Sequence, residues 1–329
     1  MDDDRSTLSP ILSTVLAFGG PLAYGFIARL IFGESTWPGW FQTLSAAFLC
    51  VVPFTLGSLT VFLASSAMRR NLWYVHLAPL FSSGAFMLAV AILAWEAWIC
   101  VVMASPIFLV ASMFGGLFVF IIFKIFDALR NTTNVSLIVL ILLAPYFIAP
   151  LESRFPPADK FRTVESVVVV NAPPEAVWQN IIRLPPIAES ERPQNFFRTA
   201  GLPRPMEALL DREGVGGIRA GQWEDGLIWI GTITEWSPDQ GFTVTLEADT
   251  SRVQSPLPLK GIGGPNFDMV DDRYWIEPRA DGKVNLHLYS TYRLTTRFNA
   301  YGSLWVDFLL RDIQNHILYV VKHRSEVGL

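Results

Sequence analysis

Three polar side chains in the second half of the chain have the types and spacing for acid–base chemistry. Asp312 and His316 stand four residues apart in a stretch without proline, so a helix would place them on one face as a carboxylate-oriented general base. Glu235 shares a strand face with Trp229 and Ile233 by alternation and could point into a pocket. The alternatives are a salt-bridged pair at the helix border and a solvated carboxylate at a strand end.

No motif for a metal ion, a covalent nucleophile or a bound phosphate is present in the sequence. The four histidines do not form HExxH or any compact cluster. There is no GxSxG motif, and neither Cys50 nor Cys100 stands near a catalytic-type histidine pattern. The glycine-rich stretch 260–267 lacks the GxxxxGK[ST] spacing of a phosphate loop. We therefore expect no metal and no cofactor, and whether the protein is an enzyme stays open.

Aromatic side chains are dense in the same half of the chain. Most of them would fill a core, but a large pocket lined by apolar and aromatic groups is the alternative. If that pocket exists, we expect nine residues to line it: Trp229, Phe242, Phe267, Tyr274, Leu288, Tyr292, Tyr301, Trp305 and Phe308.

The segment that opens this half predicts a strand running directly into a helix. Residues 163–170, TVESVVVV, are mostly β-branched, which is typical of a largely buried strand. Pro173 and Pro174 preset the helical φ angle, and Glu175 suits the positive end of a helix. An apolar helix face follows, made of Val177, Trp178, Ile181 and Ile182.

The remainder predicts an antiparallel meander and a long terminal helix. Residues 284–294 carry apolar side chains on one face and polar ones on the other, as strands of a one-faced antiparallel sheet do. Residues 299–326 lack proline and predict one helix, with Asp307, Arg311 and Gln314 along a polar side. A one-faced sheet would curl around this helix and leave a cavity. The other predicted strands are 218–224, 226–237, 242–249 and 272–278.

This order of elements resembles the START-like, or polyketide cyclase/lipid-transport (SRPBCC), helix-grip superfamily. The resemblance rests on VVVVNAPPEAVW at the start, GVGGIRAGQWEDGLIWIGTITEWSPDQGFTVTLEA in the middle and the long last helix. It covers residues 163–326, about half of the chain. It implies a helix-grip fold with a pocket for an apolar or amphipathic ligand, and no particular reaction, since the superfamily includes binders, transfer proteins and enzymes.

The first 150 residues have the composition of a membrane domain. They hold only six of the 25 Lys and Arg residues and six of the 29 Asp and Glu residues. Five apolar runs are each near the roughly 20 residues that cross a bilayer as a helix. We expect a transmembrane bundle of about five helices in 1–151, with a tight turn at Ser105-Pro106 between two of them. The runs are 10–32, 42–66, 80–103, 107–127 and 134–150.

Basic residues predict the orientation of this bundle. With five spans, five basic residues fall on one side, and an excess of Lys and Arg marks the cytoplasm. The N-terminus would then lie inside and the second half outside, in a periplasm-like space of a bacterial inner membrane. Glu96 lies in or beside a span, either as a functional carboxyl or as an interfacial one. The five basic residues are Arg5, Arg69, Arg70, Lys124 and Arg130.

Together these patterns predict an α+β protein with a multi-pass domain (1–151), a linker (152–162) and a START-like helix-grip domain (163–329). The net charge of −4 belongs to the second half, which argues against nucleic acid as a partner. The expected partners are the bilayer and an apolar or amphipathic small molecule. The leading hypothesis is a module that binds, senses or transfers this ligand. The alternatives are a cyclase- or hydrolase-type enzyme, or an interaction module whose pocket is filled.

Overall fold

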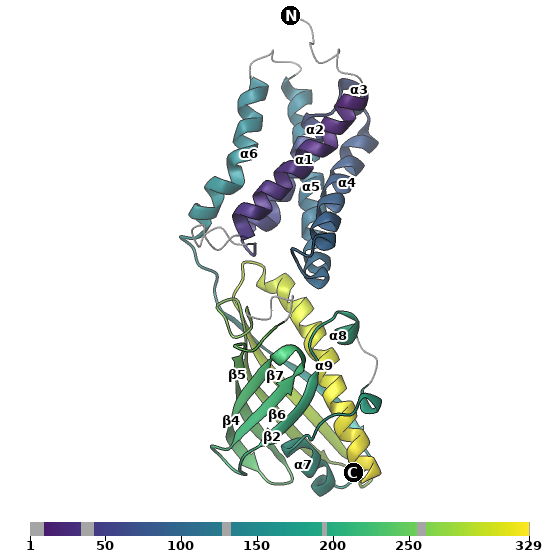
Figure 1. The fold of residues 1–329 in the computed structure, drawn as a ribbon, viewed down its shortest axis with the longest axis vertical. Helices are drawn as coiled ribbons and strands as arrows, with labels where there is room; N and C mark the ends of the chain where they lie inside the picture. The colour runs from purple at the N-terminus through teal and green to yellow at the C-terminus, as the bar shows by residue number, and fades with distance from the viewer. Residues whose placement is uncertain (1–9, 34–42, 127–132, 193–195, 255–260, 329) are drawn as a thin grey trace, which may run out of the picture. The chain divides into compact units, whose positions relative to one another are not determined.

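The computed structural model describes residues 10–33, 43–126, 133–192, 196–254 and 261–328. The chain divides into two compact units, Met1–Pro157 and Ala158–Leu329, which Figure 1 shows as a group of helices and a sheet with a long helix. Each unit is built on a different periodicity, the helical one in the first and the alternating one in the second.

The first unit consists of helices joined by short connections. Within its described residues, three helices are long and apolar enough to cross a membrane: Thr14–Gly33, Leu72–Ile92 and Trp98–Ile125. Two further apolar helices, Ala47–Phe62 and Ile138–Glu152, are shorter than a typical span. Of the five expected spans, three correspond to described helices that are long enough to cross a membrane. The elements are α1 (Pro10–Gly33), η2 (Ala47–Val51), α2 (Val52–Phe62), α3 (Ser66–Arg70), α4 (Leu72–Ile92), α5 (Trp98–Phe126) and α6 (Thr133–Glu152).

The predicted turn at Ser105-Pro106 is wrong, because both residues lie inside α5. The chain turns earlier, between α4 and α5, where Ala94 adopts a positive φ of 53°. Pro106 cannot donate the backbone hydrogen bond that would reach the carbonyl of Val102. The Ser105 hydroxyl donates to that carbonyl instead, at 2.9 Å, so the helix continues through the proline.

Small residues and hydroxyl groups hold the helices of this unit together. A Cβ atom at Gly57 would collide with the backbone of Ser112, so only glycine permits this close approach of α2 and α5. The Thr60 hydroxyl donates to the Ser82 hydroxyl at 2.9 Å between α2 and α4. Glu96 lies in the turn between α4 and α5 and forms an ion pair of 2.5 Å with Arg29. This contact favours the interfacial interpretation of Glu96 over a role within a span.

Two of the basic residues used for the predicted orientation, Arg5 and Arg130, lie outside the described residues. Arg69 and Arg70 end the short helix α3, and Lys124 lies in the last turn of α5. Orientation therefore stays a prediction.

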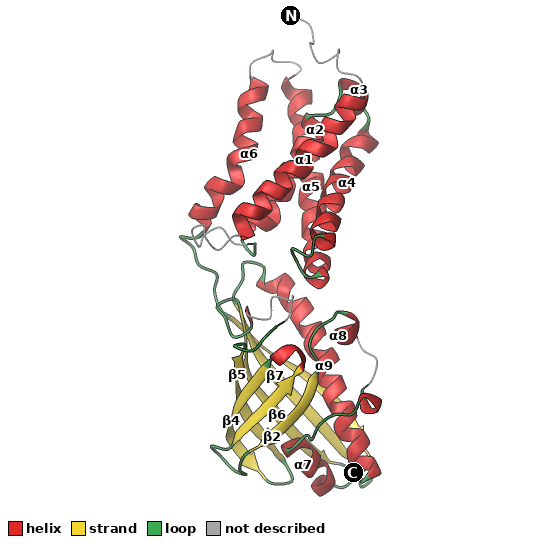
Figure 2. Cartoon of the chain, in the orientation of Figure 1, coloured by secondary structure: helices red, strands yellow, loops and turns green. Residues whose placement is uncertain are grey.

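The second unit is a seven-stranded antiparallel sheet with the order β1-β7-β6-β5-β4-β3-β2. Figure 2 shows the strands curling beside the long helix α9, which packs on β1 and β7. The strands are β1 (Lys160–Val170), β2 (Pro205–Leu210), β3 (Ile218–Trp223), β4 (Ile228–Ser237), β5 (Gly241–Asp249), β6 (Phe267–Pro278) and β7 (Val284–Leu294). The helical elements are α7 (Pro174–Ile182), η3 (Glu189–Glu191), α8 (Phe196–Thr199), η4 (Glu224–Gly226) and α9 (Asn299–Val327).

The alternation predicted for residues 284–294 is confirmed by β7, whose even-numbered side chains are buried on the helix side. The strand-to-helix opening is also present, with Val177, Trp178 and Ile181 of α7 buried in the core. Strand β2 has no counterpart in the prediction. Strand β2 has six residues and lies at the edge of the sheet, beside β3. Its short sequence gives little indication of a strand.

Candidate functional site

The face of the sheet toward α9, here called the concave face, carries a wall of aromatic and aliphatic side chains. Phe242 of β5 and Tyr274 of β6 stack with ring centres 5.0 Å apart. Trp178 of α7 meets Trp236 of β4 edge to face at 4.8 Å. Both pairs belong to the main core of the unit. This wall is an apolar and aromatic surface of the kind that lines small-molecule sites.

One arginine interrupts this apolar wall. Arg219 of β3 is half-buried, and its guanidinium carbon lies 5.5 Å from the ring centre of Tyr274 and 5.7 Å from that of Phe242. One terminal nitrogen donates to the carbonyl of Ile181 at 3.3 Å. The buried Nε has no hydrogen-bond partner among the described residues. A buried donor without a partner costs stability, which is a reason to look for a ligand there.

A carboxyl group faces the same wall. Asp272 of β6 pairs in register with Val244 and Ser290, both buried on the concave face, so its side chain lies on that face. Burial raises the pKa of Asp272 to about 6, and the Ser290 hydroxyl and the charge of Arg219 act in the opposite direction. Its buried Oδ1 accepts no hydrogen bond from the described residues. Arg219 and Asp272 thus offer a donor and an acceptor in one apolar surrounding.

A hydrogen-bond network joins this region to the helix. Gln314 of α9 is 1% exposed and donates to the carbonyl of Val164 at 3.0 Å and to the Ser290 hydroxyl at 2.9 Å. Its carbonyl accepts from the Ser166 hydroxyl at 2.8 Å. The side-chain amide of Gln314 therefore bonds to β1 and β7 through both its nitrogen and its oxygen. The network fixes the helix against the sheet.

The polar side predicted for the last helix therefore faces the sheet at two of its positions. Besides Gln314, Asp307 is buried and accepts a hydrogen bond of 2.7 Å from Tyr292, which is itself fully buried. Asp307 also pairs with Arg162 of β1 at 2.5 Å. Burial, followed by Asp307, raises the pKa of the Tyr292 hydroxyl. Polar character alone could not distinguish these buried partners from solvated side chains.

Asp312 and His316 lie on a different side of α9 from Gln314. His316 is 1% exposed, and its pKa is lowered to about 4 by burial and then by the charges of Arg192 and Arg204. Asp312 acts on it in the opposite direction and more weakly. The imidazole of His316 is therefore neutral, near the positive charges of Arg192 and Arg204. Asp312 lies close enough to influence the charge of His316, and an acid–base role for the pair stays a prediction.

Carboxylate groups form ion pairs with Arg192, Arg204 and Arg324 on this side of the domain. Arg204 binds Glu224 through two nitrogens, at 2.6 and 3.0 Å, and Arg192 binds Glu189 at 3.1 Å. Arg324 of α9 holds Glu191 through two contacts of 2.7 and 2.8 Å. Residues 185–192 and Arg204 are thereby attached to α9 and to the turn before β4.

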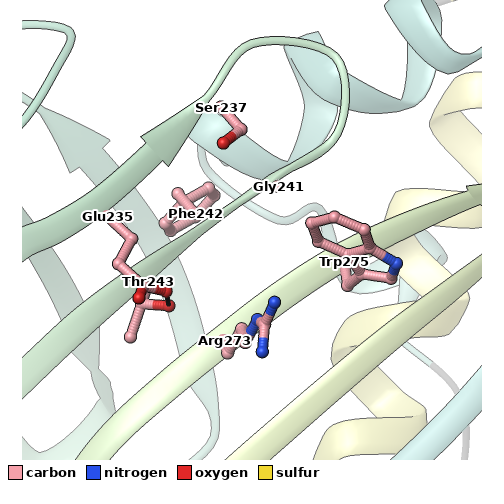
Figure 3. A pocket seen from close by; sticks show the side chains of 7 residues that line it. All are labelled: Glu235, Ser237, Gly241, Phe242, Thr243, Arg273 and Trp275. Atoms are coloured by element: carbon pink, nitrogen blue, oxygen red, sulfur yellow. Dashed lines mark hydrogen bonds between the residues drawn. The ribbon is translucent and has the colours of Figure 1, made fainter.

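Glu235 lies on the opposite face of the sheet from the one that alternation predicts. The register between β4 and β5 shifts between Ile233 and Glu235, and this bulge reverses the direction of the following side chains. Glu235 is exposed and accepts a hydrogen bond of 2.6 Å from Thr243 on the outer face (Figure 3). Trp236 is turned to the concave face instead, where it meets Trp178. The interpretation of Glu235 as a solvated carboxylate fits this position.

The nine residues predicted to line a pocket fall into three groups. Four are buried on the concave face: Phe242, Tyr274, Leu288 and Tyr292. Trp229 and Phe267 pack beside Tyr292 at one end of the sheet. Tyr301, Trp305 and Phe308 belong to α9, where Phe308 is 46% exposed and packs on Phe196 of α8 at 5.0 Å. Phe308 thus lies away from the concave wall.

Sequence reasoning did not single out Arg219 or Asp272. Arg219 is the one charged side chain in the strand IRAGQW, and a charge within a predicted strand of a half-buried sheet is a usable signal. Asp272 begins the predicted strand 272–278, where its position at the strand end resembles a turn residue. Only the pairing of β6 with its neighbours shows which face it occupies.

No family model and no curated protein matches this chain. Solved structures similar to about half of it include TTHA0849 from Thermus thermophilus, with 16% identity and a TM-score of 0.33 over 51% of this chain and 99% of that one. Norcoclaurine synthase from Thalictrum flavum matches with 11% identity and a TM-score of 0.32, over 52% and 96%. DynU16, from the dynemicin biosynthetic locus, matches with 12% identity and a TM-score of 0.31, over 50% and 48%.

Strand order and the position of α9 decide the fold of the second unit. Seven antiparallel strands curl beside a C-terminal helix that packs on β1 and β7, with α7 inserted after β1. The second unit has a helix-grip fold. In the helix-grip domain the concave face is the surface that the sheet and the grip helix enclose together. Arg219 and Asp272 lie on that surface.

Proposed function

We propose that the helix-grip domain binds an amphipathic small molecule on its concave face. The apolar part of the molecule would lie against the aromatic wall, and a polar group would reach Arg219 and Asp272. The observation that carries this proposal is the pair of unsatisfied buried atoms, Nε of Arg219 and Oδ1 of Asp272, within an otherwise apolar wall. A ligand hydroxyl or amide can accept from the first and donate to the second.

The polar end of the ligand is the part that this pair would select. A purely apolar ligand would leave both atoms without partners, at a cost of roughly 1–3 kcal/mol for each. A ligand with a hydroxyl, amide or carboxyl group recovers that cost. The site should therefore prefer such a molecule over a hydrocarbon of equal size by about tenfold or more, since about 1.4 kcal/mol is a factor of ten.

The apolar helices of the first unit support a membrane-associated setting for this binding. An amphipathic ligand partitions into the bilayer, so a domain held at the membrane meets it at a high effective concentration. We propose a multi-pass protein of a bacterial inner membrane with the helix-grip domain on the outside. The protein would bind, sense or transfer the ligand at that surface.

Ligand retention by the full chain tests the proposal. The protein would be purified in a maltoside detergent and its bound small molecules identified by mass spectrometry. We expect the wild type to retain an amphipathic molecule and the Arg219→Gln variant to lose it. Arg279→Gln, in the exposed hairpin between β6 and β7, is the matched control and should retain it. Equal retention by all three proteins, or a clean ligand-free mass for the wild type, contradicts the proposal.

A second candidate function is acid–base catalysis on the bound molecule. The specific observation is Asp272, whose pKa of about 6 is close to the value that suits a general base at neutral pH. In that case Asp272→Asn would bind the ligand as the wild type does but would leave its chemical structure unchanged on incubation. Identical products from both proteins would exclude a catalytic role for Asp272.

A further inference from the structure

The outer face of the sheet, opposite the concave face, contains a hollow of its own. It has a volume of about 320 Å³, near the lower end of the range for small-molecule sites, and opens to solvent. It lies over the start of β5, between β4 and β6 (Figure 3). Its lining is Glu235, Ser237, Gly241, Phe242, Thr243, Arg273 and Trp275.

The hollow exists because a glycine stands between two larger residues. Gly241 pairs in register with Ser237 of β4 on one side and with Trp275 of β6 on the other. A Cβ atom at position 241 would collide with the carbonyl of Tyr274 and approach the Trp275 ring to 3.1 Å. Only glycine fits, and no side chain fills the space between Ser237 and Trp275.

Opposite charges stand on the two sides of this space. Glu235 comes from β4 and Arg273 from β6, with Thr243 of β5 between them in the same row of the register. Strands are about 4.8 Å apart, so the Cα atoms of the two charged residues are separated by about 10 Å. Among the described residues neither side chain has an ion-pair partner within 4.0 Å.

The contacts that the two charged groups do make leave their charges available. The carboxylate of Glu235 accepts one hydrogen bond, from the Thr243 hydroxyl at 2.6 Å. The guanidinium of Arg273 lies over the Trp275 ring, with its carbon 5.1 Å from the ring centre. Stacking on an aromatic face orients a guanidinium without using its N–H donors. The carboxylate keeps acceptor capacity, and the guanidinium keeps its planar donor fork.

We propose that this hollow binds a small zwitterion, with its cationic group at Glu235 and its anionic group at Arg273. Charge complementarity favours this class over a simple cation or anion, because either of those would meet the like charge on the other side. The Trp275 ring and the backbone at Gly241 would contact the carbon linker between the two charges. Ser237 supplies a further hydroxyl group at the rim. This site is separate from the concave face and does not depend on the function proposed for it.

A series of ω-amino acids of increasing length measures which separation of the two ligand charges the site binds best. Glycine, β-alanine, 4-aminobutyrate, 5-aminopentanoate and 6-aminohexanoate would be titrated into the full chain in maltoside, with binding followed by NMR. We expect an optimum at an intermediate length, because the two protein charges are two strands apart. Butylamine and butyrate, each with one charge, should bind at least tenfold more weakly than the best member. Equal binding of the single-charge probes overturns the proposal.

Substitutions then locate the site. Glu235→Gln and Arg273→Gln should each weaken the best ω-amino acid at least tenfold, and Glu247→Gln, on the outer face of β5 away from the hollow, should leave it unchanged. Both test residues are exposed, so the variants should fold, and unchanged thermal midpoints would verify this. Unweakened binding in either variant overturns the assignment. Glycerophosphoethanolamine distinguishes the source of the ligand: tighter binding than the best ω-amino acid assigns a lipid headgroup, and weaker binding assigns a free zwitterion.

Discussion

The guanidinium carbon of Arg219 lies 5.5 Å from the centre of the Tyr274 ring, on the concave face of the helix-grip domain. This contact places a permanent positive charge beside a buried aromatic wall, where desolvation of the charge is costly. Burial also raises the pKa of Tyr274, so the neighbouring hydroxyl stays neutral and cannot serve as a counter-ion. A charge kept in such a place without a full set of partners indicates a function other than stability.

Replacing this arginine should separate stability from ligand retention. Arg219→Met removes the partly desolvated charge and its unpaired Nε while keeping an apolar stem of similar length. We expect the thermal midpoint of the full chain to stay the same or to rise by a few degrees, and ligand retention to be lost. Differential scanning fluorimetry and mass spectrometry measure the two effects, with Arg279→Met as the control. A large fall in the thermal midpoint would show that Arg219 is mainly structural.

Stability should depend on pH through Asp272. The pKa of this carboxyl rises from 3.8 to about 6 on folding, so its neutral form is favoured in the folded state. The stabilisation that this provides is complete below pH 3.8 and is lost as pH rises through 6. A tenfold change in an acid dissociation constant corresponds to about 1.36 kcal/mol, so the effect amounts to about 3 kcal/mol.

Asp272→Asn should remove this dependence. We expect the variant to match the wild type near pH 4 and to exceed its thermal midpoint by about 6–12 °C at pH 8, as about 3 kcal/mol implies for a domain of this size. Thermal melts from pH 4 to pH 8 provide the measurement. A constant difference between the two proteins at every pH would be incompatible with the buried carboxyl as its cause.

His316 should give the opposite dependence on pH. Its pKa falls from 6.5 to about 4 on folding, so the folded state favours the neutral imidazole. The stabilisation is complete above pH 6.5 and is lost as pH falls through 4, with an upper limit of about 3 kcal/mol. His316→Gln should flatten the acid limb of the stability profile between pH 6.5 and pH 4. His323→Gln, on an exposed position of the same helix, is the control and should leave the limb unchanged.

Gln314 should be the side chain of α9 whose loss costs most for its size. Gln314→Leu leaves the Ser166 and Ser290 hydroxyls without their present partner, and we expect a loss of about 2–4 kcal/mol. Asn315→Leu, at the exposed neighbouring position, should change stability by less than about 0.5 kcal/mol. Adding Ser166→Ala to Gln314→Leu should recover part of the loss in thermal melts, because the Ser166 hydroxyl is then no longer orphaned. A double variant less stable than the single one would indicate packing as the main contribution.

The predicted orientation can be tested at the C-terminus. Alkaline phosphatase fused after Leu329 should be active in bacterial cells, and a fluorescent protein fused at the same position should be dark if exported through the general secretory route. The three long apolar helices should keep the chain in the membrane fraction after alkaline carbonate extraction. Fluorescence at the C-terminus would place the helix-grip domain in the cytoplasm.

Local pattern was sufficient wherever one periodicity continued without interruption. The strand-to-helix passage at Pro173 and Pro174, the alternation of β7 and the long helix α9 are all legible in the sequence, because each is set by residue type within a few positions. The contrast between an apolar first half and a more highly charged second half follows from composition alone. Five apolar runs were equally legible, but within the described residues three helices have the length of a span.

Features that depend on a partner strand or helix were decided by the tertiary structure. A bulge after Ile233 turns Glu235 outward and Trp236 inward, which alternation along one strand cannot show. Arg219 and Asp272 come from strands far apart in the sequence, and only the sheet order brings their unsatisfied atoms to one face. Sequence determined which residues form elements, while pairing and burial determined which side chains meet, because each of these contacts depends on groups distant in the chain.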